Sequence, residues 1–582
     1  MIRLLKRMTG RHVAYALALI FFIAGQVIME LTVPDYMSSI TKLVNTPGTE
    51  IAQIWECGRM MLLFSVLSFV SAIIARYFSA RLAASFSQHL RHEIFRKVES
   101  FSLEEMDRFS TASLITRSTN DCTQIQNIMS RAFNQIIRVP IMAGFAFYKI
   151  STHYWQWMAF MAASLSLLVA LLVFLIIYAH PRFRKMQSYT DNINQVTREN
   201  MTGMRVVRAY NAEEYEENKF EKANEQYTNN ALQARRAMGL MQPVTRFINN
   251  ELNVGIYCIG AFLIASAGEA EQLEIFSEMV VFSTYAARIV RAFMGLNMIF
   301  NMIPRASVAA ERINAVLDTE PSIRDGSEEE GTGERGTVSF QDVSFTYPGS
   351  ATEALSDITF TAEKGQTVAF IGATGSGKST LVNLLMRFFD AARGRIIIDG
   401  RDIREYRQKQ LREKMGYASQ QAVLFTGTVA SNVSYAREMV EEKVKDAVRI
   451  AQAEEFVSAM DQGIHSAINR GGTNVSGGQK QRLSVGRAVY REPEFYIFDD
   501  TFSALDYRTD RLLRKALKQE TAGVTTFIVA QRIGTIMDAD KIIVLDEGKI
   551  VGEGTHRQLL ENCSIYQEIA RTQLSQEELA NG

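Results

Sequence analysis

The sequence offers little for a metal centre, a disulfide framework or a nucleic-acid interface. Its 582 residues carry 63 basic and 63 acidic side chains, so the formal net charge is zero and no strong positive field favours a nucleic-acid partner. There are few cysteines, none in a Cys-X-X-Cys pair and none near a histidine cluster, so we expect unpaired thiols and no zinc site. The cysteines are Cys57, Cys122, Cys258 and Cys563.

A removable signal peptide is also not expected. The first twelve residues are basic, and the long apolar run after them lacks a small-residue cleavage site, which favours a retained membrane helix. Further apolar stretches approach or exceed the roughly 20 residues that cross a bilayer. An even number of spans places both ends of the chain on one side, and the basic N-terminus marks that side as cytoplasmic. The expected spans are Val13–Met37, Met60–Ala80, Ala132–Ser151, Trp157–His180, Thr245–Ala267 and Met279–Ile303.

The chain divides by composition into three parts. Long apolar runs crowd the first 305 residues, and we interpret residues 1–320 as a six-helix, all-α membrane domain. Residues 321–336 are rich in Gly, Glu and Ser and indicate an exposed linker. Residues 337–582 alternate strand-like and helical segments and predict an α/β domain. Two polar stretches between spans, Arg81–Arg131 and Pro181–Pro243, carry apolar residues at helical spacing and predict long cytoplasmic helices rather than disordered loops.

A phosphate-binding loop is the clearest motif in the α/β domain. Residues 372–379 fit the pattern GxxxxGK[ST], between a strand-like run at Thr367–Ile371 and a helix at Ser379–Phe389. Glycines let backbone N–H groups surround phosphates, Lys378 adds charge, and the Ser379 hydroxyl can bind Mg²⁺. The predicted ATP-binding residues here are Gly372, Ala373, Thr374, Gly375, Ser376, Gly377, Lys378, Ser379 and Thr380.

A second acidic element supports this nucleotide site. The apolar run Phe495–Asp499 predicts a buried strand that ends in a carboxylate, and such a carboxylate can hold Mg²⁺ through water. Without the phosphate loop, the better interpretation would be an ordinary core strand with a polar end.

Between these two elements lies the segment Ser476-Gly-Gly-Gln479, and here the sequence resembles the ATPases of ABC transporters. The resemblance implies that this segment crosses a dimer interface and binds the γ-phosphate of ATP held by the other subunit. The residue types suit that role, because glycines expose N–H groups and the following helix directs its positive end at phosphate. The implied signature residues are Ser476, Gly477, Gly478 and Gln479.

Other segments match the family in the same order along the chain. The resemblance implies that Tyr347 stacks on adenine, that Gln420 couples the metal site to the membrane domain, and that Ser503–Asp506 contacts the opposite nucleotide. Any one of them alone could be a surface loop. The membrane half resembles ABC exporters, which implies short docking helices near Phe101–Ser113 and Glu213–Phe220.

Three positions depart from the family pattern. Asp500 replaces the usual Glu that activates water, and its carboxylate is set back by about 1.5 Å, a displacement that can cost about a hundredfold in rate. Gln531 replaces a His and cannot become a cation, and Arg470 stands where Glu is common. We therefore expect an ATP site that hydrolyses slowly, in one subunit of a heterodimer; the alternative is tolerated drift in a homodimer.

Ionisable groups at membrane depth are costly and usually face a cavity or a partner. Arg288 and Arg291 share one helix face in the sixth expected span, and with Glu251 they are our candidates for a substrate cavity. The alternative is structural, as Arg–Glu pairs between helices or side chains reaching the interface. Several polar side chains fall at this depth, among them Glu30, Arg138, Glu251, Asn253, Arg288 and Arg291.

Together these features predict one subunit of an ATP-driven exporter in a bacterial cell membrane. Its expected partners are a second ABC half-transporter, membrane lipid and a small amphipathic substrate of the multidrug type, with ATP and Mg²⁺ as cofactors. A lipid or peptide exporter, a homodimer and a regulatory ATP-gated membrane subunit are the alternatives.

Overall fold

The computed structural model describes residues 2–46, 48–150 and 154–574, and the chain folds into two compact units. The membrane unit comprises Met1–Glu99 and Ala112–Thr319, and the ATPase unit comprises Ser100–Thr111 and Glu320–Gly582. All four cysteines are free thiols, as expected. The described part of the membrane unit is built from α1 (Ile2–Leu5), α2 (Gly10–Asn45), α3 (Ile51–Glu99), α5 (Thr111–Thr116), a π-helical turn (Arg117–Asp121), α6 (Cys122–Ile150), α7 (Trp155–Thr202), α8 (Met204–Ala209), α9 (Glu213–Ser266) and α10 (Glu269–Leu317).

Among the described residues, four helices are long and apolar enough to cross a membrane: α2, α3, α7 and α9. Helices α6 and α10 contain the third and sixth expected spans but are not in this set. Each carries charge within the expected span, such as Arg138 in α6 and Arg288 in α10. The third expected span also ends at Ser151, which lies outside the described residues. A total of six spans therefore stays a prediction.

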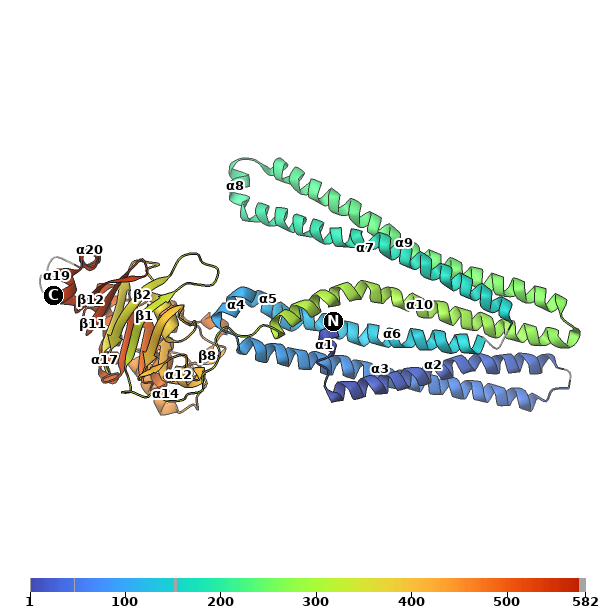
Figure 1. The fold of residues 1–582 in the computed structure, drawn as a ribbon, viewed down its shortest axis with the longest axis horizontal. Helices are drawn as coiled ribbons and strands as arrows, with labels where there is room; N and C mark the ends of the chain where they lie inside the picture. Colours follow the sequence, from blue (N-terminus) through green and yellow to red (C-terminus); the bar gives the residue numbers. More distant parts are fainter. Residues whose placement is uncertain (1, 47, 151–153, 575–582) are drawn as a thin grey trace. The chain divides into compact units, whose positions relative to one another are not determined.

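The polar stretches between spans are helical, as the spacing of their apolar residues predicts. Helices α7 and α9 run side by side and are joined through α8 (Figure 1). The short helix of this connection is α8, so the prediction of a short helix at Glu213–Phe220 was wrong. Those residues form the first turns of α9, which begins with three glutamates that suit the positive end of a helix.

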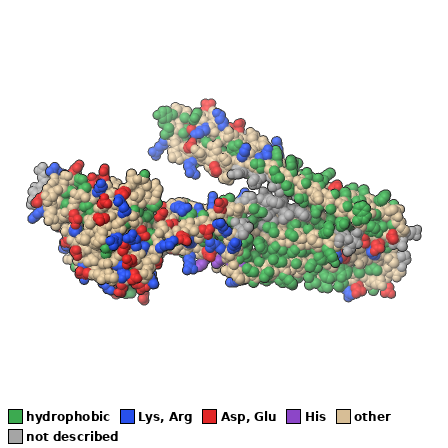
Figure 2. All heavy atoms as spheres, viewed as in Figure 1, with side chains coloured by type: hydrophobic (Ala, Val, Ile, Leu, Met, Phe, Trp, Pro, Cys, Tyr) green, Lys and Arg blue, Asp and Glu red, His purple; other side chains and the backbone are tan. Residues whose placement is uncertain are grey.

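The surface of the membrane unit is rich in apolar side chains. Figure 2 shows hydrophobic groups gathered over much of its visible face, whereas many charged groups of both signs are scattered over the ATPase unit. Large exposed side chains in this set include Phe21, Phe69, Phe174 and Phe262, from α2, α3, α7 and α9. Exposed apolar side chains in such number are typical of a surface that faces lipid.

Two sheets form the framework of the ATPase unit (Figure 1). The smaller sheet is antiparallel and has the order β2 (Leu355–Ala362), β1 (Val338–Phe345), β4 (Arg393–Ile398), β5 (Arg401–Asp402). The larger sheet is parallel except for its first pairing and has the order β12 (Lys549–Gly554), β11 (Lys541–Asp546), β3 (Thr367–Gly372), β10 (Thr525–Val529), β9 (Phe495–Asp499), β6 (Met415–Ala418). The strand predicted at Phe495–Asp499 is β9, and all five of its residues are buried.

The parallel register brings several strand ends to one edge of the larger sheet. Val529 in β10 lies opposite Asp499 in β9 and Phe370 in β3, and Ala418 in β6 lies opposite Phe498 in β9. Ligands of open α/β sheets bind at this carboxyl edge. The segments that follow these strands contain the phosphate loop, Gln420, Asp500 and Gln531.

Helices and a short ribbon complete the ATPase unit, and the expected linker 321–336 folds as part of it. The helix after the phosphate loop, α11, ends at Leu385, four residues earlier than predicted. The remaining elements are α4 (Leu103–Phe109), α11 (Lys378–Leu385), α12 (Gln408–Glu413), β7 (Gly427–Thr428), α13 (Val429–Val433), α14 (Glu441–Ile450), α15 (Glu454–Ser458), β8 (Ala467–Ile468), α16 (Gly477–Tyr490), α17 (Tyr507–Glu520), α18 (Ile533–Ile536), α19 (His556–Asn562) and α20 (Ser564–Gln573).

Candidate nucleotide site

One cavity of about 340 Å³ at the carboxyl edge of the larger sheet gathers most of the predicted nucleotide residues. Its wall comes from the phosphate loop, from the segments after β6, β9 and β10, and from the loop before β2. The lining residues are Tyr347, Ala354, Thr374, Gly375, Gly377, Lys378, Ser379, Thr380, Gln420, Asp500, Val529 and Gln531.

Two glycines give the phosphate loop a backbone that other residues rarely adopt. Gly375 has φ +86° and Gly377 has φ +101°, both in the left-handed region that favours glycine. A Cβ on Gly377 would also lie 2.6 Å from Leu355 Cδ2. The loop can therefore hold its turn, and start α11 at Lys378, only with glycine at these positions.

Lys378 lies within the loop with only 8% of its surface exposed. Its Nζ donates to the carbonyls of Gly372 at 2.8 Å and Ala373 at 2.7 Å. Burial lowers the pKa of Lys378, and the carboxylates of Asp500 and Asp499 oppose that shift. An ammonium held against backbone carbonyls at the loop is positioned to exchange them for phosphate oxygens.

A hydroxyl and a carboxylate meet beside the loop, as a Mg²⁺ site requires. Ser379 Oγ donates to Asp499 Oδ1 at 3.1 Å. Burial raises the pKa of Asp499; the Ser379 hydrogen bond opposes this shift, the Asp500 charge adds to it and the Lys378 charge opposes it. The described residues contain no group of three His, Cys, Asp or Glu that could hold a metal alone. Two oxygen donors suit Mg²⁺, which keeps waters and phosphate oxygens as its other ligands.

Gln531 and Gln420 both contact Asp500, the residue that stands where the family has its water-activating glutamate. Gln531 Nε2 donates to Asp500 Oδ2 at 2.8 Å, and Gln420 Nε2 donates to the same oxygen at 3.2 Å. Asp500 is 7% exposed and has φ 48°, a left-handed conformation that is uncommon outside glycine. Its carboxylate is thus fixed by two amides.

Tyr347 also lines the cavity. Its hydroxyl is 3.1 Å from Thr380 Oγ1, and its ring meets the rings of Phe345 and Phe389 edge to face. These contacts hold the ring in the wall of the cavity, where a planar base could stack on it.

The signature residues do not line this cavity. Ser476 instead caps α16: its Oγ accepts from Gln479 N at 3.3 Å, and its N donates to Gln479 Oε1 at 2.8 Å. Ser503 Oγ donates to the Asp500 carbonyl at 2.8 Å, and Asp506 caps α17.

Gln481 was missed by the sequence reading. It is buried on α16 and donates to the Gln420 carbonyl, and the only signal was its place two residues after Gln479.

A second cavity, the arginine cavity, lies among α2, α6 and α10 of the membrane unit and measures about 320 Å³. Arg138 Nη2 donates to Glu30 Oε2 at 2.8 Å, and Arg288 Nη1 lies 3.4 Å from Glu30 Oε1 and also donates to the Glu30 carbonyl. Among the described residues, Arg291 has no acidic partner, and its Nε donates to the Ala287 carbonyl at 3.2 Å. The lining residues are Glu30, Gln135, Arg138, Met142, Arg288, Arg291 and Ala292.

The sequence reading identified this cavity only in part. Arg288 and Arg291 line it together, but Glu251 does not: Glu251 lies on α9, where Ser164 Oγ donates to its Oε1 at 3.5 Å. Asn253 is also elsewhere, accepting from Ser283 Oγ at 2.6 Å. Glu30 pairs with two arginines, so for Arg288 the structure contains the Arg–Glu pairing considered as the alternative.

The fold and this site define a membrane protein with a fused, phosphate-loop ATPase. Comparison with known families then places the chain. The family described as ABC transporter transmembrane region matches residues 15–293, and the family described as ABC transporter matches residues 355–503. The chain therefore belongs to the ABC transporters, as an exporter-type half-transporter whose ATP hydrolysis is coupled to transport.

Relatives and a solved structure agree with this placement. An uncharacterised ABC transporter ATP-binding protein of Mycobacterium tuberculosis (strain H37Rv) is 38% identical, over 92% of this chain and 93% of the relative. An ATP-dependent lipid A-core flippase of Hahella chejuensis is 30% identical, over 99% of this chain and 97% of the relative. The structure of a bacterial Atm1-family ABC exporter with ATP bound has a similar fold, with TM-score 0.79 and 23% identity, covering 97% of this chain and all of that one.

Proposed function

We propose that this chain is one subunit of a heterodimeric exporter that moves amphipathic small molecules out of a bacterial cell, and that its own nucleotide site binds ATP but hydrolyses it slowly. In this proposal it crosses the cell membrane six times with both ends in the cytoplasm. The partner is a second half-transporter, which supplies a site where hydrolysis is fast.

The observation that carries this proposal is the fixation of Asp500 by Gln420 and Gln531. A general base must reach the water that it activates. The shorter side chain of aspartate sets its oxygens back, and both amide groups donate to the one oxygen, Oδ2. Gln531 also cannot supply the positive charge of a protonated histidine. These features leave the phosphate-binding groups intact while weakening the step that cleaves ATP.

The residues have separate roles in this proposal. The phosphate loop and Lys378 would hold the phosphates of ATP, Tyr347 would stack on the base, and Ser379, Gln420 and Asp499 would hold Mg²⁺, which neutralises phosphate charge. Ser476, Gly477, Gly478 and Gln479 would contact the ATP bound by the partner. These four residues do not line this chain's own cavity, which is compatible with that role.

ATPase measurements on the complex with its partner, reconstituted in lipid vesicles, test the proposal. Asp500→Asn should change turnover less than twofold, whereas removal of the partner's catalytic base should abolish turnover. With the partner's base removed, the double variant Asp500→Glu with Gln531→His should restore turnover by about tenfold. A large loss from Asp500→Asn alone contradicts the slow-site proposal, and full activity of the chain without a partner contradicts the heterodimer.

The arginine cavity favours a second candidate, export of lipids or other amphiphiles with an acidic headgroup. Three arginines and one glutamate line it, which leaves two positive charges in excess. An anionic headgroup would balance this charge through charge-assisted hydrogen bonds. Among the relatives, the protein of Hahella chejuensis and others of similar identity are named as ATP-dependent lipid A-core flippases.

A matched pair of amphiphiles separates the two candidates. ATP-dependent flux of a fluorescent dodecyl phosphate and of its dodecyltrimethylammonium counterpart is compared in vesicles. Faster flux of the phosphate, lost in Arg291→Gln but kept in the exposed control Arg59→Gln, supports the second candidate. Equal flux of both probes supports the multidrug type, and no ATP-dependent flux of any amphiphile supports a regulatory subunit.

A further inference from the structure

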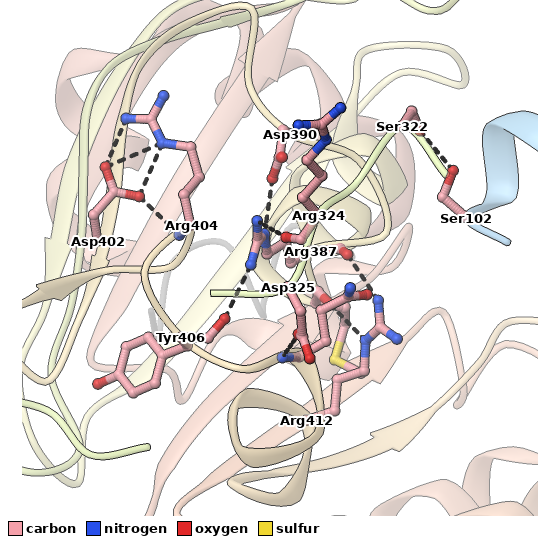
Figure 3. A network of polar contacts seen from close by, with 12 residues as sticks. Ser102, Ser322, Arg324, Asp325, Arg387, Asp390, Asp402, Arg404, Tyr406 and Arg412 are labelled. Carbon is pink, nitrogen blue, oxygen red and sulfur yellow. Dashed lines mark hydrogen bonds and ion pairs between the residues drawn. The ribbon is translucent and has the colours of Figure 1, made fainter. Parts of the chain in front are cut away.

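The segment expected to be an exposed linker is hydrogen-bonded to the ATPase unit along its backbone. We call residues 322–333 the linker brace. Gly326 N donates to the Tyr406 carbonyl at 3.2 Å, and the carbonyl of Glu328 accepts from Arg407 N at 2.8 Å, so the brace runs beside the segment before α12 as a parallel bridge. Asp325 Oδ1 also accepts from Gln408 N, at 2.7 Å, at the start of α12 (Figure 3).

Glycines in the brace allow its backbone to pack closely against neighbouring segments of the ATPase unit. A Cβ on Gly326 would collide with the backbone of Glu405, and one on Gly331 would collide with Asp399. A Cβ on Gly333 would lie 3.0 Å from Gly400 Cα. Most side chains of the brace are exposed, as predicted, but its glycine content reflects tight packing of its backbone.

One end of the brace is bound to α4, the short helix between α3 and α5. Glu105 is 5% exposed, and its two carboxylate oxygens act separately. Oε1 accepts from Ser322 N at 2.9 Å, while Oε2 accepts from Ser102 N at 2.9 Å and so caps α4. The hydroxyls of Ser102 and Ser322 are also 2.7 Å apart (Figure 3). Burial raises the pKa of Glu105, but these hydrogen bonds outweigh it, and the net pKa is lowered, so the carboxylate is ionised.

The next residues of the brace are bound to the end of the phosphate-loop helix. Arg387, 2% exposed, follows α11 by two residues and has φ 51°. Its Nη2 donates to the Arg324 carbonyl at 2.9 Å, its Nη1 to the Tyr406 carbonyl at 3.1 Å, and its Nε to Asp390 Oδ1 at 2.9 Å. One buried guanidinium thus joins the brace, the segment paired with it and the loop after α11 (Figure 3).

A continuous set of contacts therefore joins α4 to the helix that begins at Lys378. Glu105 binds Ser322 at one end, Arg387 binds Arg324 two residues further along the brace, and α11 lies between Arg387 and the phosphate loop. Arg412 Nη2 donates to the Arg387 carbonyl at 2.9 Å and holds this end of α11 in place. Contacts of this kind can transmit a shift of α11 to α4, because conformational coupling acts by moving packed elements between defined positions.

We propose that Glu105 and Arg387 are positioning residues that link nucleotide binding at the phosphate loop to α4 through the linker brace. A shift of α11 on nucleotide binding moves Arg387, the brace and α4 together. Because α4 follows α3 in the sequence after only three residues, a movement of α4 acts on a membrane helix of the same chain. The proposal is independent of the identity of the substrate and of the partner.

Three variants separate this role from simple support of the fold. Glu105→Gln keeps the cap on α4, because glutamine also serves in a capping box, but loses the carboxylate acceptor for Ser322 N. Arg387→Lys keeps the charge but cannot make the three divergent contacts of a guanidinium. Arg324→Gln is the matched control: it removes an exposed ion pair with Glu320 and leaves the Arg324 carbonyl in place.

Hydrogen exchange of the full chain in lipid nanodiscs, with and without Mg²⁺ and a non-hydrolysable ATP analogue, tests the proposal. We expect the analogue to slow exchange in α4 by about tenfold in the wild type and in Arg324→Gln, a coupling of ordinary size. In Glu105→Gln and Arg387→Lys the effect should fall below twofold, while the amides of 372–380 stay protected. A purely structural role would instead raise α4 exchange equally in both states.

The proposal is overturned if Glu105→Gln keeps the wild-type response of α4 to the analogue, or if wild-type α4 does not respond. Protection of the amides of 372–380 reports nucleotide binding itself. A fault in the assignment of the nucleotide site is therefore seen separately from a fault in the linkage.

Discussion

The nucleotide cavity and the arginine cavity have similar volumes, and both place acids beside cations, but they are assembled in opposite ways. In the nucleotide cavity, the polar side chains lie just after the ends of strands in one sheet, and most of them belong to short motifs of contiguous residues. In the second, Glu30, Arg138 and Arg288 come from three helices far apart in the sequence. The charge balance also differs. Two carboxylates, Asp500 in the lining and Asp499 behind it, act on the single cation Lys378 at the first cavity, whereas arginines outnumber Glu30 in the second.

This difference in charge suggests different tasks for the acids. Asp499 is buried beside a second carboxylate, which raises its pKa and makes its charge costly until a cation arrives. Glu30 instead lies between two arginines and compensates part of their charge. We infer that the carboxylates of the nucleotide cavity favour binding of a cation together with phosphates, and that Glu30 stabilises the packing of the arginine cavity. Substitutions in each cavity test this difference.

The largest effect is expected from removing the cation of the nucleotide cavity. Lys378→Ala should weaken binding of a fluorescent ATP analogue by about a hundredfold, because charge-assisted contacts to phosphate are lost. Equilibrium fluorescence titration of the full chain measures this. Circular dichroism should show an unchanged fold, since the lysine's partners are loop carbonyls. Affinity within threefold of the wild type would remove the assignment of Lys378 as a phosphate ligand.

The next effect concerns the acid of the arginine cavity. Glu30→Gln should lower the free energy of unfolding by about 2 kcal/mol, because Arg138 and Arg288 lose their carboxylate partner in a partly buried site. Thermal unfolding in detergent measures it, with the exposed Glu56→Gln as the matched control. Dodecyl phosphate should restore much of the loss in Glu30→Gln by supplying the missing charge. Unchanged stability without any anion would mean that Glu30 does not hold this cavity together.

The contrast also explains what the sequence could and could not predict. The phosphate loop and Asp499 could be found from spacing and strand pattern along the chain, whereas Asp500, Gln420 and Gln531 were found through the resemblance to ABC ATPases. Parallel pairing of the strands then brings these segments together. The arginine cavity depends on the register between helices. Arg288 and Arg291 share a helix face and were identified, but the pairing of Glu30 with Arg138 requires the packing of α2 on α6.

Contact partners add information at two other places. Glycines in 321–336 predicted an exposed linker, and most of its side chains are exposed, but glycine also serves a tightly packed backbone, and only the neighbouring chain shows that it does so here. Glu251 looked like a cavity acid because it lies at membrane depth, but its helix face turns it toward Ser164. In both places the deciding information is the contact partner.

The smallest predicted effect has the opposite sign to that of Glu30→Gln. Asp499→Asn should raise the free energy of unfolding of the nucleotide-free chain at pH 7, by about 1 kcal/mol, the usual size for a single substitution. The sign follows from linkage. A carboxyl whose folded pKa is raised above its unfolded value destabilises the fold while it is ionised, and that penalty fades as the pH falls through the folded pKa toward the ordinary value near 4. The gain from Asp499→Asn should therefore shrink between pH 7 and pH 4, as measured by thermal unfolding at each pH.

The same variant should lose the Mg²⁺-dependent part of nucleotide binding, because its amide retains the hydrogen bond from Ser379 but not the charge. If Asp499→Asn instead destabilised the chain at pH 7, the acids of the two cavities would play the same role and the contrast between them would fail.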